Sequence, residues 1–368
     1  MKTKTILILG GYGGVGRVIA ELLLKFTNAR IIIAGRRLEK AQELADSLNG
    51  KFKKNRVSAK FADTSGQNSL ETAFQKIDLV LVCTTSPEDI LLVAKTALKS
   101  NIDYLDIQFE QKVFTELKLL EPEINRSGQL FITQAGFHPG LPAVFVRKGA
   151  QYFDQYDKAV IAMAMNSRFE QPESTKDLVN SVRDFKAHVF KGHNWKSAGY
   201  KDVIKINFGN KVGVKKCYPL DLVEIKEMVK LYKLKEAGIY VSGFNWFVDN
   251  IIFPSIIISH KIKKNSLTKL WMRLTCWGMN TFSPAESYVV FLLKAAGKKH
   301  QKEVNLNIKA SHSDPYLFTA APVAACIIQY LNQKIKKKGL QMMGQIVETD
   351  YFFNDLKKMG IKIEISAS

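Results

Sequence analysis

The sequence of 368 residues has few cysteines, a deficit of acidic side chains and no hydrophobic run long enough to span a membrane. Its four cysteines lie far apart, without a CxxC pair or a Cys/His cluster at zinc spacing, which argues against a disulfide scaffold, a zinc ribbon or a dithiol redox site. The most apolar stretch, residues 247–259, is far shorter than the roughly 20 residues that a spanning helix needs. No homeodomain, zinc-finger or RNA-binding-sheet motif is present, so nucleic acid is not an expected partner.

The N-terminus also lacks the pattern of a secretory signal. Met1 to Lys4 lead directly into an apolar stretch that glycines interrupt, without the longer apolar region and cleavage site of a signal peptide. We therefore expect a mature start and a cytoplasmic protein. Apolar residues make up 46% and charged residues 24% of the chain, which excludes global disorder, and the length favours two domains.

The charge is unevenly distributed along the chain. The net charge is +20, and the part that ends at Ala135 contributes only +4 of it. A basic second part is typical of proteins that attract an acidic substrate or an anionic membrane surface. The alternative is a lysine-rich surface that serves solubility alone.

The first part of the chain alternates short apolar runs with helical patterns. Runs that are apolar on both faces indicate buried strands, and their alternation with helices predicts a doubly wound parallel sheet of the Rossmann type in an α/β fold. The expected strands are 5–9, 30–34, 57–61, 79–83, 104–107 and 130–133, and the expected helices are 15–25, 38–48 (ended by Asn49-Gly50), 69–75 and 88–99.

After Gly140 the pattern becomes mixed and predicts a second α+β domain. Alternation indicates strands at 158–165, near 203–208 and near 304–310, and helical spacing indicates a helix at 175–191. A small-faced helix at 316–336, a helix at 350–358 and a strand at 361–365 are expected to follow.

The strongest motif is a glycine-rich turn between the first strand and the first helix. It contains GxGxxG as Gly11, Gly13 and Gly16. These glycines permit a tight turn, close approach of the backbone to a pyrophosphate and close helix packing, and the helix N-terminus favours phosphate. The turn therefore predicts a dinucleotide site that includes Gly11, Tyr12, Gly13, Gly14, Val15 and Gly16.

The end of the second strand indicates which dinucleotide binds. An NAD site usually has Asp or Glu there, whereas this chain has Gly35 followed by Arg36 and Arg37. Guanidinium groups bind a 2′-phosphate, so NADP is favoured over NAD; the alternative is two solvated arginines at the head of a helix. Asp63, after the third strand, either caps a turn or contacts the adenine.

The loop after the fourth strand offers three hydroxyl groups, from Thr84, Thr85 and Ser86. In doubly wound folds this loop lies next to the pyrophosphate and the nicotinamide ribose. The same residues are also typical of a helix start, because Pro87 follows Ser86.

Residues 10–16, 34–37, 104–106 and 135–142 come in the order and spacing of the saccharopine dehydrogenase-like family, which this chain resembles. That family includes saccharopine reductases and carboxynorspermidine synthases. The resemblance implies an NADP-dependent oxidoreductase that transfers a hydride to or from a carbonyl or imine carbon of a small molecule. It also implies a Rossmann domain at 1–135, an inserted substrate and dimerisation domain at 136–315, a helix at 316–336 that returns to the first domain, and a C-terminal helix and strand within 337–368.

Two side chains are candidates for acid–base chemistry. Asp106 ends the fifth strand and His138 follows the sixth, so both are expected at the carboxyl edge of the sheet. The alternatives are a turn residue for Asp106 and a loop-shaping residue for His138. His188 and His193 are five residues apart, which does not align two metal ligands on a helix, so no metal site is expected. A non-catalytic NADP-binding sensor or scaffold is the alternative function.

The apolar stretch 247–259 allows three interpretations. Lys261, Lys263 and Lys264 follow it, and Lys269, Trp271, Arg273 and Trp277 come next. Aromatic and basic residues beside an apolar block are typical of a membrane-surface patch or of an oligomer interface. The remaining interpretation is a buried helix pair. A membrane contact would make the protein a membrane-surface reductase of a lipid-like substrate.

Overall fold

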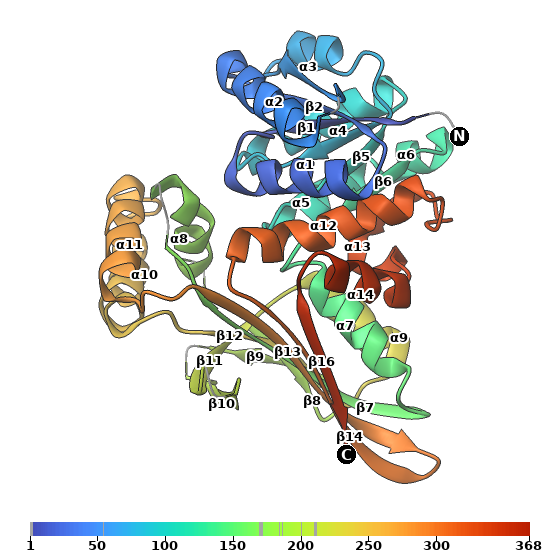
Figure 1. Cartoon of the computed structure of the whole chain (residues 1–368). Coiled ribbons are helices and arrows are strands. Elements are labelled where there is room, and N and C mark those ends of the chain that lie inside the picture. The colour runs from blue at the N-terminus through green and yellow to red at the C-terminus, as the bar shows by residue number, and fades with distance from the viewer. Residues whose placement is uncertain are drawn as a thin grey trace. The chain divides into compact units, whose positions relative to one another are not determined.

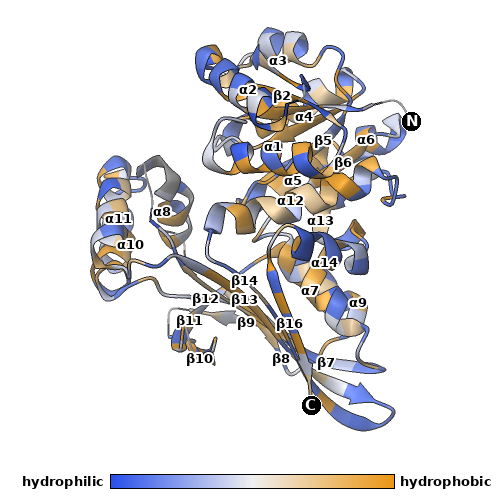
Figure 2. Ribbon diagram, viewed as in Figure 1, coloured by the Kyte–Doolittle hydropathy of each residue, from blue (hydrophilic) through white to orange (hydrophobic). Residues whose placement is uncertain are grey.

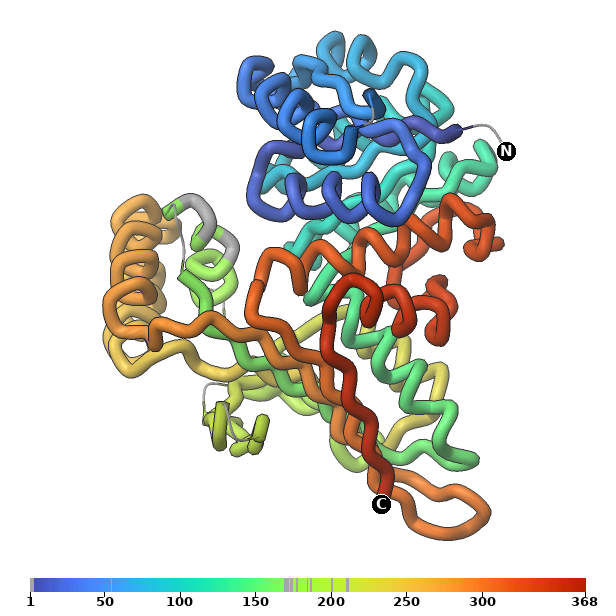
Figure 3. Tube along the Cα trace, viewed as in Figure 1, coloured from blue at the N-terminus to red at the C-terminus, as the bar shows by residue number. Residues whose placement is uncertain are grey.

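The computed structural model describes residues 3–53, 55–168, 172–183, 185, 187–199, 201–209 and 212–368. The chain forms two compact units, each with its own sheet (Figures 1 and 3). Unit 1 comprises Met1–Val144 and Tyr316–Gly360, and unit 2 comprises Phe145–Pro315 and Ile361–Ser368.

Unit 1 is built on a seven-stranded sheet in which every pair of neighbours is parallel. The strand order is β3-β2-β1-β4-β5-β6-β15, so the order reverses between β1 and β4 and their carboxyl ends form the switch point of a doubly wound fold. The predicted Rossmann-type sheet is confirmed. Its strands are β1 (Thr5–Leu9), β2 (Arg30–Gly35), β3 (Val57–Phe61), β4 (Leu79–Val82), β5 (Asp103–Asp106), β6 (Leu130–Thr133) and β15 (Gly339–Met342).

Burial explains why these short runs form strands. Ile6 to Leu9 and all of β4 are buried, as continuous apolar runs in a sheet covered on both faces must be. The helices around the sheet are α1 (Gly14–Phe26), α2 (Leu38–Phe52), α3 (Gln67–Ala73), the 3₁₀ turn η1 (Pro87–Asp89), α4 (Ile90–Lys99), α5 (Gln111–Leu119), α6 (Glu121–Ser127), α12 (Pro315–Leu331), α13 (Met343–Ile346) and α14 (Thr349–Lys358). Helices such as α1 and α4 bury one apolar stripe against the sheet, and Figure 2 shows hydrophobic and hydrophilic residues along them, whereas α12 is buried on nearly all sides.

Helices α2 and α12 end several residues from their expected ends. Helix α2 continues past Asn49 to Phe52, because the Asn49 side chain bonds the backbone of Arg56 and Val57 at the start of β3 and does not end the helix. Helix α12 ends at Leu331, five residues before the predicted end at Lys336.

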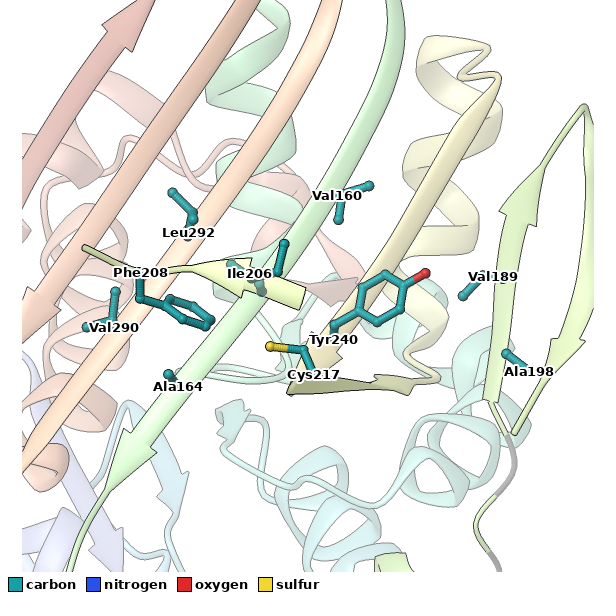
Figure 4. Packing of buried hydrophobic residues seen from close by; sticks show 11 residues of the cluster. Val160, Ala164, Val189, Ala198, Ile206, Phe208, Cys217, Tyr240, Val290 and Leu292 are labelled. Atoms are coloured by element: carbon teal, nitrogen blue, oxygen red, sulfur yellow. The ribbon is translucent and has the colours of Figure 1, made fainter. Parts of the chain in front are cut away.

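Unit 2 contains a nine-stranded mixed sheet, as the predicted α+β character requires. Its main path is β10-β11-β12-β7-β13-β14-β16, in which β7 and β12 are parallel and the other neighbours antiparallel. One face buries Val160, Cys217, Tyr240 and Leu292 (Figure 4). The strands are β7 (Gln155–Asn166), β8 (Ala187–Lys191), β9 (Asn194–Ala198), β10 (Ile204–Asn207), β11 (Val214–Leu220), β12 (Glu236–Ser242), β13 (Tyr288–Lys299), β14 (Lys302–His312) and β16 (Lys362–Ala367).

The prediction of a single helix at 175–191 is wrong. The structure has α8 only over Lys176–Arg183, and Ala187–Lys191 forms β8, while residues 184 and 186 lie outside the described residues. Ala187 and Val189 are buried and pair with β9, so a period of two prevails there over the helical pattern. The other helical segments are α7 (Leu141–Ala150), η2 (Pro172–Thr175), α9 (Val223–Tyr232), the π-helical turn η3 (Val248–Ile252), α10 (Phe253–Ile262) and α11 (Thr268–Phe282).

Candidate active site

The glycine-rich turn lies at the switch point of unit 1. Gly10 donates from its N–H to the carbonyl of Ala34 on β2 at 2.8 Å, and Gly13 donates to the carbonyl of Gly10 at 2.9 Å. Helix α1 begins at Gly14 without a side-chain cap and without an acidic residue in its first turn. The first N–H groups of a helix lack partners within it, so this helix start offers donors and a positive dipole to an anion.

The glycines of the motif have different tasks. A Cβ at Gly16 would lie 2.7 Å from the Gly10 carbonyl oxygen and 2.8 Å from the Gly11 Cα, so Gly16 is needed for close packing. A Cβ at Gly13 would meet only the Gly10 oxygen, at 3.1 Å, and Gly13 is exposed. Gly13 therefore presents bare backbone to the space in which a pyrophosphate binds.

Tyr12 lies across the end of β2. A Cβ on Gly35 would come within 2.6 Å of the Tyr12 ring, so the absence of a side chain at position 35 makes room for that ring. The Tyr12 hydroxyl accepts a hydrogen bond from the Arg37 N–H at 3.3 Å, and the Arg37 guanidinium lies 5.3 Å from the ring centroid. The place where an NAD site has a carboxylate is thus taken by an aromatic ring with a guanidinium above it.

Asp63 acts as a turn residue. Its Oδ1 accepts hydrogen bonds from the N–H and the hydroxyl of Ser65, and these bonds hold the pKa of the carboxyl below its usual value, with the charge of Arg36 adding to the effect. Asp63 thus makes the contacts of a turn residue, and its contact with the adenine stays a prediction. Arg36 and Arg37 are both exposed at the end of β2.

The loop after β4 runs beside the glycine turn. Thr84 lies against Gly10, since a Cβ on Gly10 would be 3.2 Å from the Thr84 methyl group, and the Thr84 hydroxyl is buried without a hydrogen-bond partner among the described residues. Thr85 is exposed, and the Ser86 side chain makes no capping hydrogen bond to the helical turn that follows. All three hydroxyls therefore remain candidates for cofactor contacts.

Asp106 is completely buried at the carboxyl end of β5. Its Oδ1 accepts from the backbone N–H groups of Gln108, at 3.0 Å, and of Gln134, at 3.3 Å, while Oδ2 has no partner within the described part of the chain. Burial raises the pKa of Asp106 to about 6, against the lowering effect of those N–H groups and of the hydroxyls of Thr133 and Tyr104. Neither hydroxyl lies in the geometry of a full hydrogen bond to Asp106.

His138 follows β6 and is held between aromatic rings. The Phe137 and Phe109 rings lie edge-on to it, with centroids at 4.4 Å and 5.5 Å, and its Nδ1 is buried without a described partner. Burial lowers the pKa of His138 to about 4, so the imidazole is neutral at pH 7. Of the two candidates for acid–base chemistry, Asp106 is the one whose pKa lies closer to neutral pH.

Several neighbours of this site carried no recognisable signal in the sequence. The side-chain amide of Gln108 donates to the Thr84 carbonyl at 2.8 Å and so links the loops after β4 and β5. The Tyr316 ring, at the start of α12, would be 2.5 Å from a Cβ on Gly14 and covers the first residue of α1. Burial and the nearby charge of Asp106 raise the pKa of the Cys83 thiol, which makes Cys83 a poor nucleophile.

Comparison with known proteins agrees with this geometry. Residues 6–131 match the family model of the saccharopine dehydrogenase NADP binding domain. This part of the chain is similar to that NADP-binding family. The predicted resemblance and the predicted cofactor, NADP, are thereby confirmed, and the domain is dehydrogenase-like. No curated protein matches the chain.

One solved structure extends the similarity from the NADP-binding domain to the whole fold. Apo saccharopine dehydrogenase (L-Glu forming) from Saccharomyces cerevisiae matches 99% of this chain and 100% of its own, with a TM-score of 0.74 and 16% identity. The DAP dehydrogenase of C. glutamicum in complex with DAP matches 97% of this chain and 99% of its own, with a TM-score of 0.48 and 9% identity. The likeness to the yeast enzyme shows a shared two-part fold.

The residues of unit 1 fit NADP. Gly13 leaves bare backbone for the pyrophosphate, and the end of β2 offers two exposed guanidinium groups and no carboxylate for the 2′-phosphate. Thr84 and the neighbouring hydroxyls line the adjacent strand end, where the sugar next to the nicotinamide is expected.

Replacing Asp106 by asparagine is expected to change how stability depends on pH. Between the ordinary pKa of 3.8 and the folded value of about 6, the native state binds more protons than the unfolded state, so the free energy of unfolding falls as the pH rises through this range. At pH 7 the buried charge costs about 3 kcal/mol, since each pH unit is worth about 1.4 kcal/mol. Asp106→Asn should recover up to that amount at pH 7 and almost none at pH 4, as measured by urea unfolding.

Asp63→Asn is the matched control for that experiment. The pKa of Asp63 is lowered, so its ionisation contributes stability that is already complete above pH 4 and is lost only on further acidification. Between pH 4 and pH 7 this variant should follow the wild type at a constant offset. A constant offset for Asp106→Asn as well would show that Asp106 does not titrate in this range.

Proposed function

We propose that the protein is an NADP-dependent oxidoreductase that transfers a hydride to or from a carbonyl or imine carbon of a small molecule. The observation that carries the proposal is the buried Asp106, which lies at the same strand edge as the glycine turn and the loop of Thr84. Its Oδ2 has no hydrogen-bond partner among the described residues. A carboxyl with a pKa near 6 can both hold and release a proton at neutral pH.

The chemistry needs a hydride and a proton at neighbouring atoms. NADPH supplies the hydride to the substrate carbon when it is bound, and the substrate oxygen or nitrogen then takes up a proton. Asp106 holds that proton at Oδ2 and keeps its orientation through the N–H groups of Gln108 and Gln134. Neutral His138 orients the substrate by a hydrogen bond at Nδ1, and the backbone around Gly13, with Arg36 and Arg37, holds the cofactor.

The parts of the chain have separate roles in this proposal. Residues 1–135, with the helix at 316–336, bind the cofactor, residues 136–315 bind the substrate and form a homodimer, and 337–368 complete the fold. The name of the yeast relative, saccharopine dehydrogenase (L-Glu forming), makes saccharopine and L-glutamate the first compounds to test. We propose a cytoplasmic location, with peripheral membrane contact through residues 247–277 as argued in the next subsection.

Turnover of NADPH tests the proposal. The full chain should consume NADPH when a carbonyl compound is supplied together with an amino acid such as L-glutamate, as followed by the loss of NADPH absorbance. Asp106→Asn should slow turnover by about 100-fold or more, the usual contribution of a general acid, and should leave NADPH affinity unchanged. His138→Gln should raise the KM for the substrate more than it lowers kcat if His138 orients the substrate.

Binding without turnover would contradict the proposal. Tight NADPH binding with no oxidation in the presence of any 2-oxo acid, imine or other carbonyl compound would favour the alternative of a sensor or scaffold. An Asp106→Asn variant with full turnover would remove Asp106 from the chemistry. Light scattering tests the dimer independently, and a monomer at micromolar concentration would exclude it.

A further inference from the structure

A helical hairpin in unit 2 has a core of its own. Helices α10 and α11 pack side by side with α8 (Figure 1), and their inner faces are buried against one another. The side chains buried in this core are not the apolar side chains that are exposed on the outer surface of the hairpin. The exposed side chains are therefore not needed to hold the hairpin together. The members of the core are Val179, Val182, Val248, Ile252, Phe253, Ile256, Met272 and Met279.

The hairpin tip, defined as residues 258–270, turns its polar groups inward. Ser259 accepts from the Ser266 hydroxyl at its carbonyl, at 3.1 Å, and from the Trp271 indole N–H at its hydroxyl, at 2.9 Å. Arg183 of α8 donates to the Thr268 hydroxyl at 2.6 Å. Trp271 is thereby directed toward α10, so the expectation that it belongs to an outer aromatic patch is wrong. These bonds fix the tip and satisfy its polar groups internally.

Apolar side chains occupy the outside of the same tip. Ile262 is 83% exposed, and Ile258, Leu267 and Leu270 are exposed as well. Seven of the fifteen exposed large hydrophobic residues in the described part of the chain lie between Trp246 and Trp277. Figure 2 shows hydrophobic and hydrophilic residues together on α10 and α11. Single exposed apolar residues need no explanation, but such a concentration marks an interaction surface.

The charge of this segment has one sign. From Asn250 to Ala285 the sequence contains five basic residues and no aspartate or glutamate. All five are exposed, and four of them belong to the tip. They are Lys261, Lys263, Lys264, Lys269 and Arg273.

We propose that the hairpin tip docks on an anionic lipid bilayer. Ile258, Ile262, Leu267 and Leu270 enter the boundary between head groups and acyl chains, and the lysines reach the phosphates beside them with their long side chains. Apolar insertion and basic residues together provide the two signals that stable peripheral binding needs. No helix among the described residues is long and apolar enough to cross a membrane, so this contact is interfacial.

A second copy of the chain fits this surface less well. In a twofold interface the same patch meets itself, so the lysines of one tip would face the lysines of the other without an acidic residue from this segment to neutralise them. A nucleic acid would satisfy the charges but would leave the exposed isoleucines and leucines in water or against phosphate. An anionic bilayer satisfies both sets of side chains.

Sedimentation of the full chain with vesicles tests the proposal. The protein should sediment with vesicles of equimolar phosphatidylcholine and phosphatidylserine at low salt, less at moderate salt, and little with pure phosphatidylcholine. Lys263→Gln/Lys264→Gln should weaken binding about 25-fold, because each basic residue near an anionic surface adds about five-fold in affinity. Ile262→Ser/Leu267→Ser should weaken binding at least ten-fold, and the loss should persist at moderate salt.

Matched control variants distinguish docking through the hairpin tip from nonspecific electrostatic or hydrophobic binding to the vesicles. Lys336→Gln/Lys337→Gln removes two adjacent exposed lysines from unit 1, and Leu119→Ser removes an exposed leucine there. Both variants should bind vesicles as the wild type does. Thermal unfolding should be the same for all variants, because every substituted side chain is exposed.

Three results would overturn the proposal. The first is a protein that stays in the supernatant with anionic vesicles at low salt. The second is equal weakening by the tip variants and by the matched controls, which would indicate adsorption by net charge alone. The third is a concentration-dependent dimer in light scattering that Ile262→Ser/Leu267→Ser dissociates, which would assign the tip to a second copy. None of these results bears on NADPH turnover.

Discussion

Replacing Gly13 by valine is expected to reduce NADPH affinity by at least about 100-fold while unit 1 stays folded. A Cβ at this position would meet only the Gly10 oxygen within the protein, at 3.1 Å, and Gly13 has an extended backbone that valine readily adopts. The added side chain would therefore project into the space for the pyrophosphate, where it would keep the phosphates from the N-terminus of α1. Fluorescence titration with NADPH measures the loss.

Two other glycine variants, Gly50→Ala and Gly16→Ala, serve as comparisons for Gly13→Val. Gly50 lies in α2 with nothing within 4 Å of an added Cβ, so Gly50→Ala should raise the free energy of unfolding by about 0.5–1 kcal/mol and leave NADPH affinity unchanged. Gly16→Ala should destabilise unit 1, because its Cβ would contact backbone at 2.7 Å. Normal NADPH binding by Gly13→Val would show that the cofactor does not lie over this turn.

Removing both arginines at the end of β2 is expected to lower NADPH affinity by about 100-fold or more and to leave NADH affinity nearly unchanged. Hydrogen bonds to charged groups are worth about 1.5–3 kcal/mol each, and NADH lacks the phosphate that Arg36 and Arg37 would contact. Parallel titrations of Arg36→Ala/Arg37→Ala with the two cofactors measure the ratio. Arg30→Ala, which removes an exposed arginine at the opposite end of the same strand, should change neither affinity.

Equal losses for NADPH and NADH would contradict this assignment. Such a result would mean that the arginines maintain the shape of the turn, for example through the contact of Arg37 with Tyr12. Tyr12→Phe separates the two roles, because it keeps the ring beneath Arg37 and removes only the hydroxyl that accepts from the Arg37 N–H. Under our interpretation this variant retains most of its preference for NADPH.

The cofactor site could be predicted from the sequence because its parts lie close together along the chain. A strand, a glycine turn and a helix start follow one another within residues 5–26, and the end of β2 lies one βαβ unit away. The chemical environment of Asp106 and His138 could not be predicted from the sequence in this way. The pKa of each depends on burial, and burial at the end of β5 and β6 depends on distant segments such as the loop of Thr84 and the ring of Phe109.

In unit 2, part of the secondary structure could not be predicted from the sequence either. Residues 187–191 were expected to continue a helix, and they form a strand because β9 and β12 are available to pair with them. Strands β11, β12 and β13 were not predicted from the pattern, and two of them, β12 and β13, pair with β7, which lies far earlier in the chain. Propensity over a short window cannot represent such pairing.

The sequence by itself determined the doubly wound sheet of unit 1, the position of the dinucleotide turn and the preference for NADP, because continuous apolar runs, glycine spacing and the residues at one strand end suffice for each. Only the tertiary structure decided which candidate acid has a pKa near neutrality, that Tyr12 occupies the space left by Gly35, and which side chains of residues 247–277 face outward. Those outcomes depend on which atoms remain in contact with water, and exposure to water is a property of the packed chain rather than of any short segment of it.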